Sequence, residues 1–290
     1  MKSFAKKVIT NSVIHYTRLR VNALAILSPQ HAAEFALKLF TTPRTKSKRS
    51  LQVPLLQQAQ RIAIAHNGEK ANLYHIKNEG ATKRILLVHG WESDSGFWKY
   101  YYPLLLANNY EIFALDAIAH GLSTGKSTNA IEYQQLISKL LHNYAPFDAL
   151  MAHSLGTLVS TFAVQETKNV DNIKLVLVSP APYSQTHFNA LQHILKLSPR
   201  VMNTLYSLVH KRLGMRVNEY SIYDVIKNNP TIRMCIAHDT HDIPCPIAET
   251  RTLLTLNAPN VILHETQGLG HNKIAKVSSV SDIIMAYLNT

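Results

Sequence analysis

A serine between small residues marks a sharp corner in this chain. The apolar run 147–151 is short and follows a proline, which predicts a buried strand. After Ser154, apolar residues recur at helical spacing, namely Leu158, Val159, Phe162 and Ala163. A strand that turns directly into a helix at a serine leaves the hydroxyl exposed above the sheet, with the helix N-terminus behind it. The chain is thereby limited to folds in which a buried strand is followed directly by a helix.

The neighbours of Ser154 fit such a corner. The residues two before and two after it press against adjacent backbone, where a large side chain would clash. Gly156 meets this need, while Ala152 carries one methyl group more than the G-x-S-x-G pattern asks for. The corner predicts a nucleophilic Ser154, and a serine that only caps a helix is the alternative.

An upstream turn offers hydrogen-bond donors for this serine. The predicted strand 84–88 ends in His89-Gly90-Trp91, and the glycine allows a tight turn. We predict that the backbone NH groups of Trp91 and Leu155 hold the negative oxygen that forms when a serine attacks a carbonyl. The Trp91 indole is either a pocket wall or a packed core side chain.

Acidic and basic candidates follow two later predicted strands. The strand 232–237 runs into a loop with Asp239 and Asp242, and carboxyl ends of parallel strands share one sheet edge. His271 lies in a glycine-flanked loop after the strand-like residues 261–264. Because the chain has fifteen histidines, His271 is selected by this loop and by its place after the aspartates. On this pattern alone, either aspartate can be the acid.

Together these motifs resemble the α/β-hydrolase family from about residue 61 to the C-terminus. The segment Asp116–Ser123 is similar to the family's Asp-x-x-x-x-Gly-x-Ser loop, and serine, acid and histidine come in the family's order. The likeness is greatest to bacterial lysophospholipases, esterases and serine aminopeptidases. It implies an α/β fold with a mostly parallel central sheet flanked by helices.

The resemblance also implies roles for the candidate residues. The spacing from Asp242 to Cys245 matches an Asp-x-x-Val-Pro loop, which leaves Asp239 as a turn former. Ser154 is then the nucleophile, His271 takes its proton and Asp242 orients His271. The expected substrate is a small-molecule carboxylic ester or related acyl compound of open chain length, with thioesters, lysophospholipids and peptides as alternatives. We expect neither a metal nor an organic cofactor.

The two cysteines, Cys235 and Cys245, resemble neither a disulfide framework nor a metal-binding set. Cys235 is expected to pack within its strand. Cys245 lies close to the proposed acid, but no strand-to-helix corner precedes it. We therefore do not expect Cys245 to be a nucleophile.

Positive charge is concentrated at the start of the chain, where residues 1–50 carry +9 of the total +12. This argues against a nucleic-acid-binding surface on the rest of the chain. Residues 4–27 have an approximately helical apolar face, and Ser28-Pro29 predicts the start of a second helix that reaches Phe40. Such basic helices lie on an anionic membrane surface or pack against the body or a partner chain.

No run of eighteen apolar residues and no convincing signal peptide is found, so we expect a cytoplasmic protein that is either free or peripheral at a membrane. Residues 1–50 are predicted as a basic extension and linker, and 51–290 as the hydrolase domain. Residues of about 181–230 lie between two predicted strands and are more than a simple crossover needs. We predict that they form a helical cap over the serine. Candidate pocket residues are His153, Phe188, Leu191, Leu205 and Tyr206.

Two alternatives stay open at this point. An apolar stripe at helical spacing, as in the predicted cap, is also typical of plain helix packing. A non-catalytic binding module that docks through its basic N-terminal helices is the competing functional class. The set of Ser154, Asp242 and His271 argues against it, and Ala152 is a mild argument for it.

Overall fold

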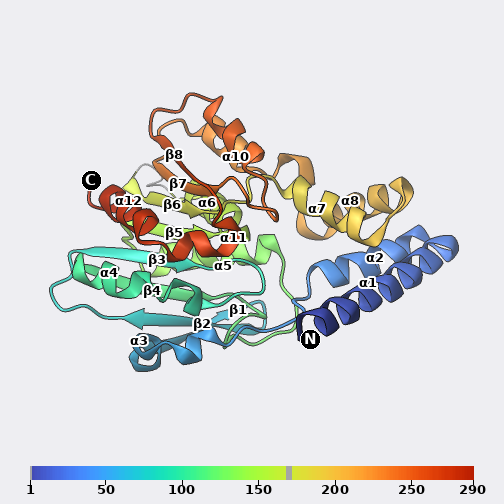
Figure 1. The fold of residues 1–290 in the computed structure, drawn as a ribbon, viewed down its shortest axis with the longest axis horizontal. Helices are drawn as coiled ribbons and strands as arrows, with labels where there is room; N and C mark the ends of the chain where they lie inside the picture. Colours follow the sequence, from blue (N-terminus) through green and yellow to red (C-terminus); the bar gives the residue numbers. More distant parts are fainter. Residues whose placement is uncertain (1, 168–171) are drawn as a thin grey trace. The chain divides into compact units, whose positions relative to one another are not determined.

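A computed structural model describes residues 2–167 and 172–290. Within them the strands form one eight-stranded sheet in the order β1-β2-β4-β3-β5-β6-β7-β8 (Figure 1). The strands are β1 (Gln60–His66), β2 (Glu69–Ile76), β3 (Lys83–Val88), β4 (Tyr110–Asp116), β5 (Ala149–His153), β6 (Lys174–Val178), β7 (Met234–Asp239) and β8 (Val261–Thr266). β2 pairs antiparallel with β1 and β4, and all pairs from β4 to β8 are parallel. The mostly parallel sheet expected from the resemblance is confirmed.

Helices connect and cover these strands. They are α1 (Lys2–Leu27), α2 (Pro29–Phe40), α3 (Pro54–Gln58), α4 (Tyr101–Ala107), α5 (Ala130–Asn143), α6 (Leu155–Gln165), α7 (Ser184–Leu195), α8 (Pro199–Leu213), α9 (Ile222–Asn228), α10 (Ile247–Leu254), α11 (Gly270–Lys273) and α12 (Ser278–Leu288). Short 3₁₀ turns include η1 (Arg49–Gln52) and η2 (Ser95–Trp98). The second N-terminal helix begins at Pro29, with Ser28 as its N-cap, and ends at Phe40, as predicted.

The central strands are buried on both faces, which explains why they read as unbroken apolar runs. Leu87, Met151 and Val176 belong to a cluster that also holds side chains of α4 and α12. Alternate residues such as Leu86 and Leu150 point to the opposite face, where α5 and α6 pack together. The predicted strands are found within two residues of their expected positions. Their carboxyl ends therefore meet along one edge.

The chain divides into two compact units. The body comprises Pro43–Pro182 and Ser221–Thr290, and the helical unit comprises Met1–Thr42 and Tyr183–Tyr220. Helices α1 and α2 of the predicted extension 1–50 thus share one unit with α7 and α8 of the predicted cap 181–230, whereas α9, also within 181–230, belongs to the body. Residues 43–50 instead join the body.

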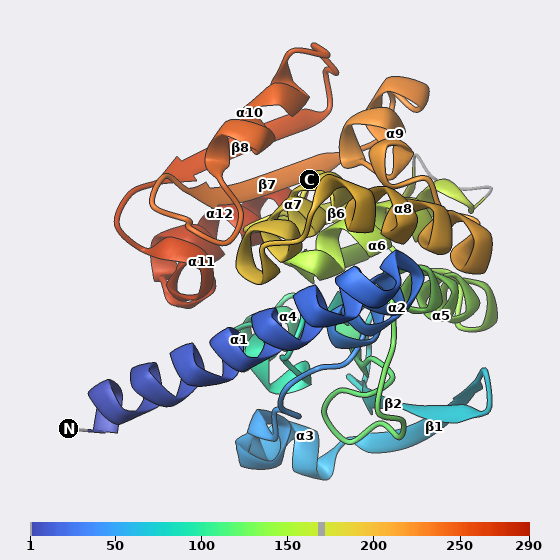
Figure 2. The same ribbon diagram turned by 90° about the vertical axis from the view of Figure 1, so that its right-hand side faces the viewer.

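Within the helical unit, α2 folds back along α1 (Figure 2). α1 also packs against α7, and α2 packs against α8. The buried side of α2 is lined by small residues and one leucine, namely Ala32, Ala33, Ala36 and Leu37. None of the helices that the structure describes is both long and apolar enough to cross a membrane.

The segment predicted as a linker is fastened to the body by hydrogen bonds. Lys46 Nζ donates to the Ser123 carbonyl at 2.8 Å, and the Ser50 backbone NH donates to the Asp94 carboxylate at 3.3 Å. Ser50 is buried. After residue 42 the chain is therefore part of the body rather than a free tether.

Candidate active site

Ser154 stands at the corner between β5 and α6. Its φ of 53° and ψ of −128° are unusual for a residue with a side chain, as expected of a sharp, strained turn. The Ser154 NH donates to the Val178 carbonyl at 3.1 Å, which ties the corner to β6. The local sequence thus produces the turn that the small-residue pattern predicted.

Close backbone approach explains the small residues around this corner. A Cβ atom on Gly156 would lie 2.6 Å from the His89 carbonyl oxygen, and one on Gly90 would lie 2.8 Å from Ser154 Cβ. Ala152 is fully buried in β5. Its additional methyl group, the departure from the family pattern, is therefore accommodated in the core.

The structure brings together the three residues selected as nucleophile, base and acid. His271 Nε2 lies 3.0 Å from Ser154 Oγ, and His271 Nδ1 lies 2.8 and 3.0 Å from the two carboxylate oxygens of Asp242. A proton on Nδ1 is donated to the carboxylate, which leaves Nε2 to accept the serine proton. This chain of contacts has the geometry that a base-activated serine requires.

A histidine that sequence reasoning missed supports the carboxylate of Asp242. His238 Nε2 lies 2.9 Å from the Cys245 carbonyl and 3.3 Å from Asp242 Oδ2, while its Nδ1 lies 2.8 Å from Thr250 Oγ1. Because Nε2 faces two acceptors, it carries the proton. The one sequence signal was a histidine that directly follows the apolar residues 234–237 of β7.

Hydrogen bonds also keep Asp242 ionised although it is buried. Burial alone raises the pKa of this carboxyl. Donation from His238, His271 and the Cys245 NH outweighs burial and holds the pKa of Asp242 well below its usual range. The carboxylate is therefore negative at neutral pH, as orientation of His271 requires.

Asp239 forms a turn, as predicted, and also fixes the loop that carries the histidine. Its Oδ1 accepts from the His241 NH at 2.9 Å. Its Oδ2 accepts from Thr266 Oγ1 at 2.7 Å and from the Leu269 NH at 2.9 Å, two residues before His271. Burial opposes ionisation, but these hydrogen bonds prevail and lower the pKa of Asp239 to about 2.

His153 lies behind the site and makes a direct contact with His271. Its Nε2 is 3.0 Å from the His271 carbonyl oxygen, and its ring stacks on Phe97 with centroids 4.1 Å apart. Burial, reinforced by the nearby His271, lowers the pKa of His153 to about 3, so the ring is neutral. These contacts suit a residue that positions His271, whereas its predicted role in the substrate pocket stays a prediction.

The predicted oxyanion donors lie on two fixed turns. Leu155 is the first residue of α6, and the first NH groups of a helix have no partner within it. Before Trp91, His89 donates from Nδ1 to the Gly90 carbonyl at 2.7 Å and accepts from the Ala117 NH at 3.1 Å. Burial lowers the pKa of His89 to about 4, so this bridge is uncharged at neutral pH.

The predicted linker braces the same turn. Arg44 donates to the Glu92 carboxylate from its backbone NH at 2.7 Å and from its guanidinium at 2.6 and 2.8 Å. Glu92 directly follows Trp91 and has a φ of 55°. The Trp91 indole meets the His120 ring edge-on, with centroids 4.9 Å apart. Residues far apart in sequence thus hold the candidate oxyanion turn.

The loop Asp116–Ser123, singled out by its family resemblance, is a structural clasp. The Asp116 carboxylate accepts from the Ser95 NH and hydroxyl at 2.8 and 2.7 Å and from the Leu122 NH at 3.0 Å. Gly121 is required because a Cβ there would lie 2.1 Å from Asp116 Oδ2. Burial raises the pKa of Asp116 to about 6 against these donors.

The four remaining pocket candidates belong to the helical unit. Phe188 contacts Phe40 and Tyr206, with ring centroids 4.8 and 5.8 Å apart. Leu205 is fully buried and Leu191 is half-buried. Phe188, Tyr206 and Leu205 thus pack inside this unit, and a role of these four residues in substrate binding stays a prediction.

Cys245 lies beside Asp242, as the sequence predicted. It is 2% exposed, and its NH donates to Asp242 Oδ1 at 3.0 Å. Burial raises the pKa of the thiol well above its ordinary value, so it is protonated at neutral pH. Cys235 is buried within β7, as predicted.

Comparisons with known proteins agree with this architecture. The sequence model of the family described as serine aminopeptidase S33 matches residues 79–243. A serine hydrolase-like protein of Dictyostelium discoideum is 24% identical over 162 residues, which are 53% of this chain and 43% of the relative. The chain therefore spans less than half the length of that relative.

Solved structures with the same fold cover most of the chain. An esterase of Pyrococcus furiosus superposes with a TM-score of 0.61 at 20% identity and covers 86% of this chain and 97% of its own. A membrane phospholipase A, described as a bacterial virulence factor, superposes with a TM-score of 0.57 at 14% identity. That match covers 100% of this chain and 98% of the phospholipase chain, and both matches show the α/β-hydrolase fold.

Proposed function

Because the chain belongs to the serine aminopeptidase S33 family of α/β-hydrolases, we propose that it hydrolyses carboxylic esters through an acyl-enzyme on Ser154. One observation carries the proposal, the continuous contact from Ser154 Oγ through His271 to the ionised Asp242. A serine hydroxyl is a weak nucleophile until a base takes its proton, and this contact supplies one. No step of the proposed reaction needs a cofactor.

The proposed reaction has two halves. As Ser154 Oγ attacks the carbonyl carbon, its proton passes to His271 Nε2, and Asp242 stabilises the resulting imidazolium. The NH groups of Leu155 and Trp91 bind the oxygen that becomes negative, and each such donor contributes roughly a hundredfold to a thousandfold in rate. His271 then protonates the departing alcohol, and water activated by the same nitrogen releases the acid.

The activities of two structural neighbours support an ester rather than another acyl compound. One is an esterase and the other a phospholipase A. Thioesters, lysophospholipids and peptides are cleaved by the same machinery and are the alternatives within enzymes. We propose a small ester, and the helical unit, with Phe188, Leu191, Leu205 and Tyr206, as the part that sets acyl-chain preference.

The first test is labelling with a fluorescent fluorophosphonate, followed by hydrolysis of p-nitrophenyl esters from acetate to palmitate. We expect wild type to be labelled and Ser154→Ala to remain unlabelled. The chain-length optimum separates small from lipid-like substrates. A folded wild-type protein without labelling or turnover would contradict the proposal and favour a non-catalytic binding module.

We further propose that the helical unit docks on an anionic membrane surface, with the protein on the cytoplasmic side. Helix α1 exposes an apolar face, with Val13, Tyr16, Leu19, Ile26 and Leu27 between 59% and 88% exposed. Their positions fall on one side of a helix at 100° per residue. Arg20, on the same side, lies over the Phe35 ring, and the helical unit has eleven Lys and Arg against two Glu, a charge of +9. Anionic lipid complements this charge, whereas a second copy repels it.

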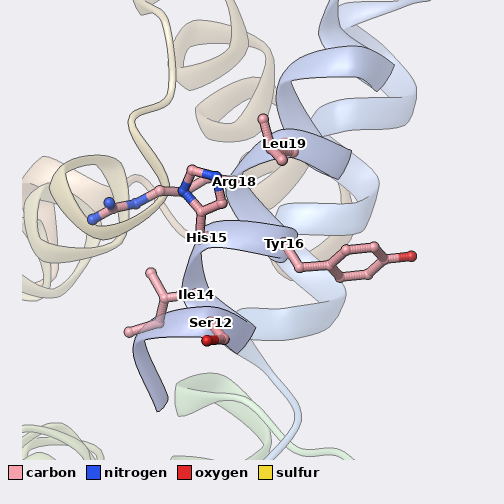
Figure 3. Close-up of a pocket in the computed structure, with 6 residues that line it drawn as sticks. All are labelled: Ser12, Ile14, His15, Tyr16, Arg18 and Leu19. Carbon is pink, nitrogen blue, oxygen red and sulfur yellow. The ribbon is translucent and has the colours of Figure 1, made fainter. Parts of the chain in front are cut away.

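A hollow along α1 lies beside this apolar face. It measures about 680 Å³ and is lined by Ser12, Ile14, His15, Tyr16, Arg18 and Leu19. Figure 3 shows the Tyr16 ring extending away from Arg18. Arg18 donates to the Ile194 carbonyl of α7. One side of α1 is thus anchored within its unit, and Tyr16 and Leu19 are left for contact with lipid.

Sedimentation with liposomes tests this docking. Wild type is expected to sediment with vesicles that contain phosphatidylglycerol, and Tyr16→Ser/Leu19→Ser to sediment several-fold less. Ile262→Ser, which removes an exposed apolar residue of the body, is the matched control and should behave as wild type. Equal sedimentation of all three proteins would overturn the assignment.

A further inference from the structure

Three donor atoms of different chemistry converge beside Ser154. Among the residues whose side chains the structure describes, Asp242, Cys245 and His271 form the one group of three metal-ligating side chains. One carboxylate oxygen, the sulfur and one ring nitrogen lie within 4.8 Å of one another. Two of these residues come from the loop after β7 and the third from α11.

The thiol of Cys245 has no part in the proposed ester hydrolysis. The backbone NH of Cys245 supports Asp242, and any residue other than proline supplies that group. Valine is expected at this position in the loop that the sequence resembles, and valine would fill the same space without a donor atom. The sulfur therefore adds a soft ligand to a pair that already contains a carboxylate and an imidazole.

We propose that Asp242, Cys245 and His271 form a binding site for Zn²⁺ and that zinc bound there inhibits the enzyme. Thiolate and imidazole ligands select zinc over magnesium or calcium, which prefer oxygen. The carboxylate and the thiolate together balance the two positive charges of the ion. Ser154 Oγ, which lies 3.0 Å from His271 Nε2, or a water molecule completes the fourfold set.

The site needs small movements to close around the ion. Ligands of a tetrahedral zinc, at about 2.0–2.3 Å from the metal, lie roughly 3.3–3.8 Å apart. The three donor atoms now lie within 4.8 Å of one another, so displacements of about 1 Å by side-chain rotation bring them to that range. On binding, the thiol sulfur bonds to zinc and its proton passes to solvent, while no electron is transferred.

Inhibition follows from the use of His271 and rests on the proposed function. A histidine turned toward a metal is withdrawn from its alignment with Ser154 and Asp242 and no longer accepts the serine proton. Binding itself does not depend on that function. Metal binding and ester hydrolysis can therefore be measured separately.

The test uses the full-length protein and Cys245→Val, with Cys235→Val as a control that removes the other buried thiol. Zn²⁺ affinity is measured by calorimetry, and Co²⁺ serves as a spectroscopic probe of thiolate ligation. Wild type and Cys235→Val should bind one zinc, and Cys245→Val should bind at least about tenfold more weakly. The near-ultraviolet thiolate-to-cobalt absorption should disappear in Cys245→Val only.

Inhibition is read as the rate with zinc divided by each protein's own rate without zinc, with reversal by a chelator. Equal zinc affinity, or equal zinc inhibition, in wild type and Cys245→Val would overturn the site. Thermal unfolding verifies that each variant is folded. If Cys245→Val does not fold, Cys245→Ser is used in its place. Cobalt absorption in a protein without esterase activity would support the metal site and contradict the proposed function. Esterase activity in a protein without cobalt absorption would support the proposed function and contradict the metal site.

Discussion

The body buries polar side chains, whereas the helical unit exposes apolar ones. In the body, buried polar groups such as Asp116, His89 and Asp242 are held by several hydrogen bonds each. In the helical unit, apolar side chains such as Leu19 and Ile26 face outward. A fixed polar network suits catalysis, because its donors are in place before the reaction. An exposed apolar face suits recognition of another surface.

The largest expected effect is on the body's chemistry. Ser154→Ala should lower kcat for p-nitrophenyl esters by roughly 10⁴–10⁶-fold, because the nucleophile is lost. The free energy of unfolding should change little, since the hydroxyl is not part of the core. Steady-state kinetics and urea unfolding measure the two quantities. Retained turnover would transfer the nucleophile to another residue.

The two aspartates of the loop after β7 sharpen the comparison within the body. Asp242→Asn should lower kcat by roughly 10⁴-fold, because His271 loses the carboxylate that sets its tautomer. Asp239→Asn should lower kcat far less, by about tenfold, because it only loosens the tether at Leu269. A larger loss in Asp239→Asn than in Asp242→Asn would reverse the assignment of the acid.

Acid should destabilise the body through its buried histidines. Burial lowers the pKa of His89 to about 4 and the pKa values of His120 and His153 to about 3, against about 6.5 in the unfolded chain. As pH falls below 6.5, these histidines bind protons in the unfolded state but stay neutral in the folded state. Stability present above pH 6.5 is then lost toward pH 3–4, at about 1.4 kcal/mol per pH unit for each histidine.

Urea unfolding at pH 7, 6 and 5 measures this loss. His153→Asn should make the free energy of unfolding less dependent on pH, because one histidine with a lowered pKa is removed. A free energy of unfolding that stays constant from pH 7 to 5 would show that these histidines accept protons in the folded state.

One glycine in each unit tests how closely other atoms approach its backbone. Gly156→Ala places a Cβ 2.6 Å from the His89 carbonyl, so the free energy of unfolding should fall by about 3 kcal/mol. Gly214→Ala, at the C-terminus of α8, meets nothing within 4 Å but has a φ of 68°, and should cost about 1 kcal/mol. Urea unfolding compares them. Equal losses would mean that the corner at Ser154 can relax.

The smallest effect is expected on the outer face of α1. Leu27 is 83% exposed, so Leu27→Ser should change the free energy of unfolding by less than about 0.5 kcal/mol. The same urea experiment measures it. A loss above about 2 kcal/mol would mean that this side chain is covered in solution, and the contrast between the units would disappear.

Local patterns were sufficient to predict the strands, the corner at Ser154 and the helix at Pro29, because each depends on a few neighbouring residues, whereas the parallel sheet came from the resemblance. Asp242 was chosen over Asp239 only through resemblance, since both follow the same strand. The supports given by His238 and Arg44 were missed. Their partners are fixed by the fold, and no spacing distinguishes one of fifteen histidines from another.

The grouping of the helices could not be predicted for a related reason. An apolar helical face indicates that a helix packs, but not against which partner. The buried residues of α2, such as Ala33 and Leu37, fitted packing on the body equally well. Contact between α2 and α8 joins segments that are more than 150 residues apart in sequence.

The composition of the helical unit from two separate stretches of chain affects its biosynthesis. Helices α1 and α2 emerge from the ribosome before α7 and α8, with the whole of 43–182 made in between. At about 5–20 residues per second, the first hairpin waits several seconds or longer with its apolar sides uncovered. During that interval a chaperone or a nearby lipid bilayer is the available shelter for the nascent hairpin.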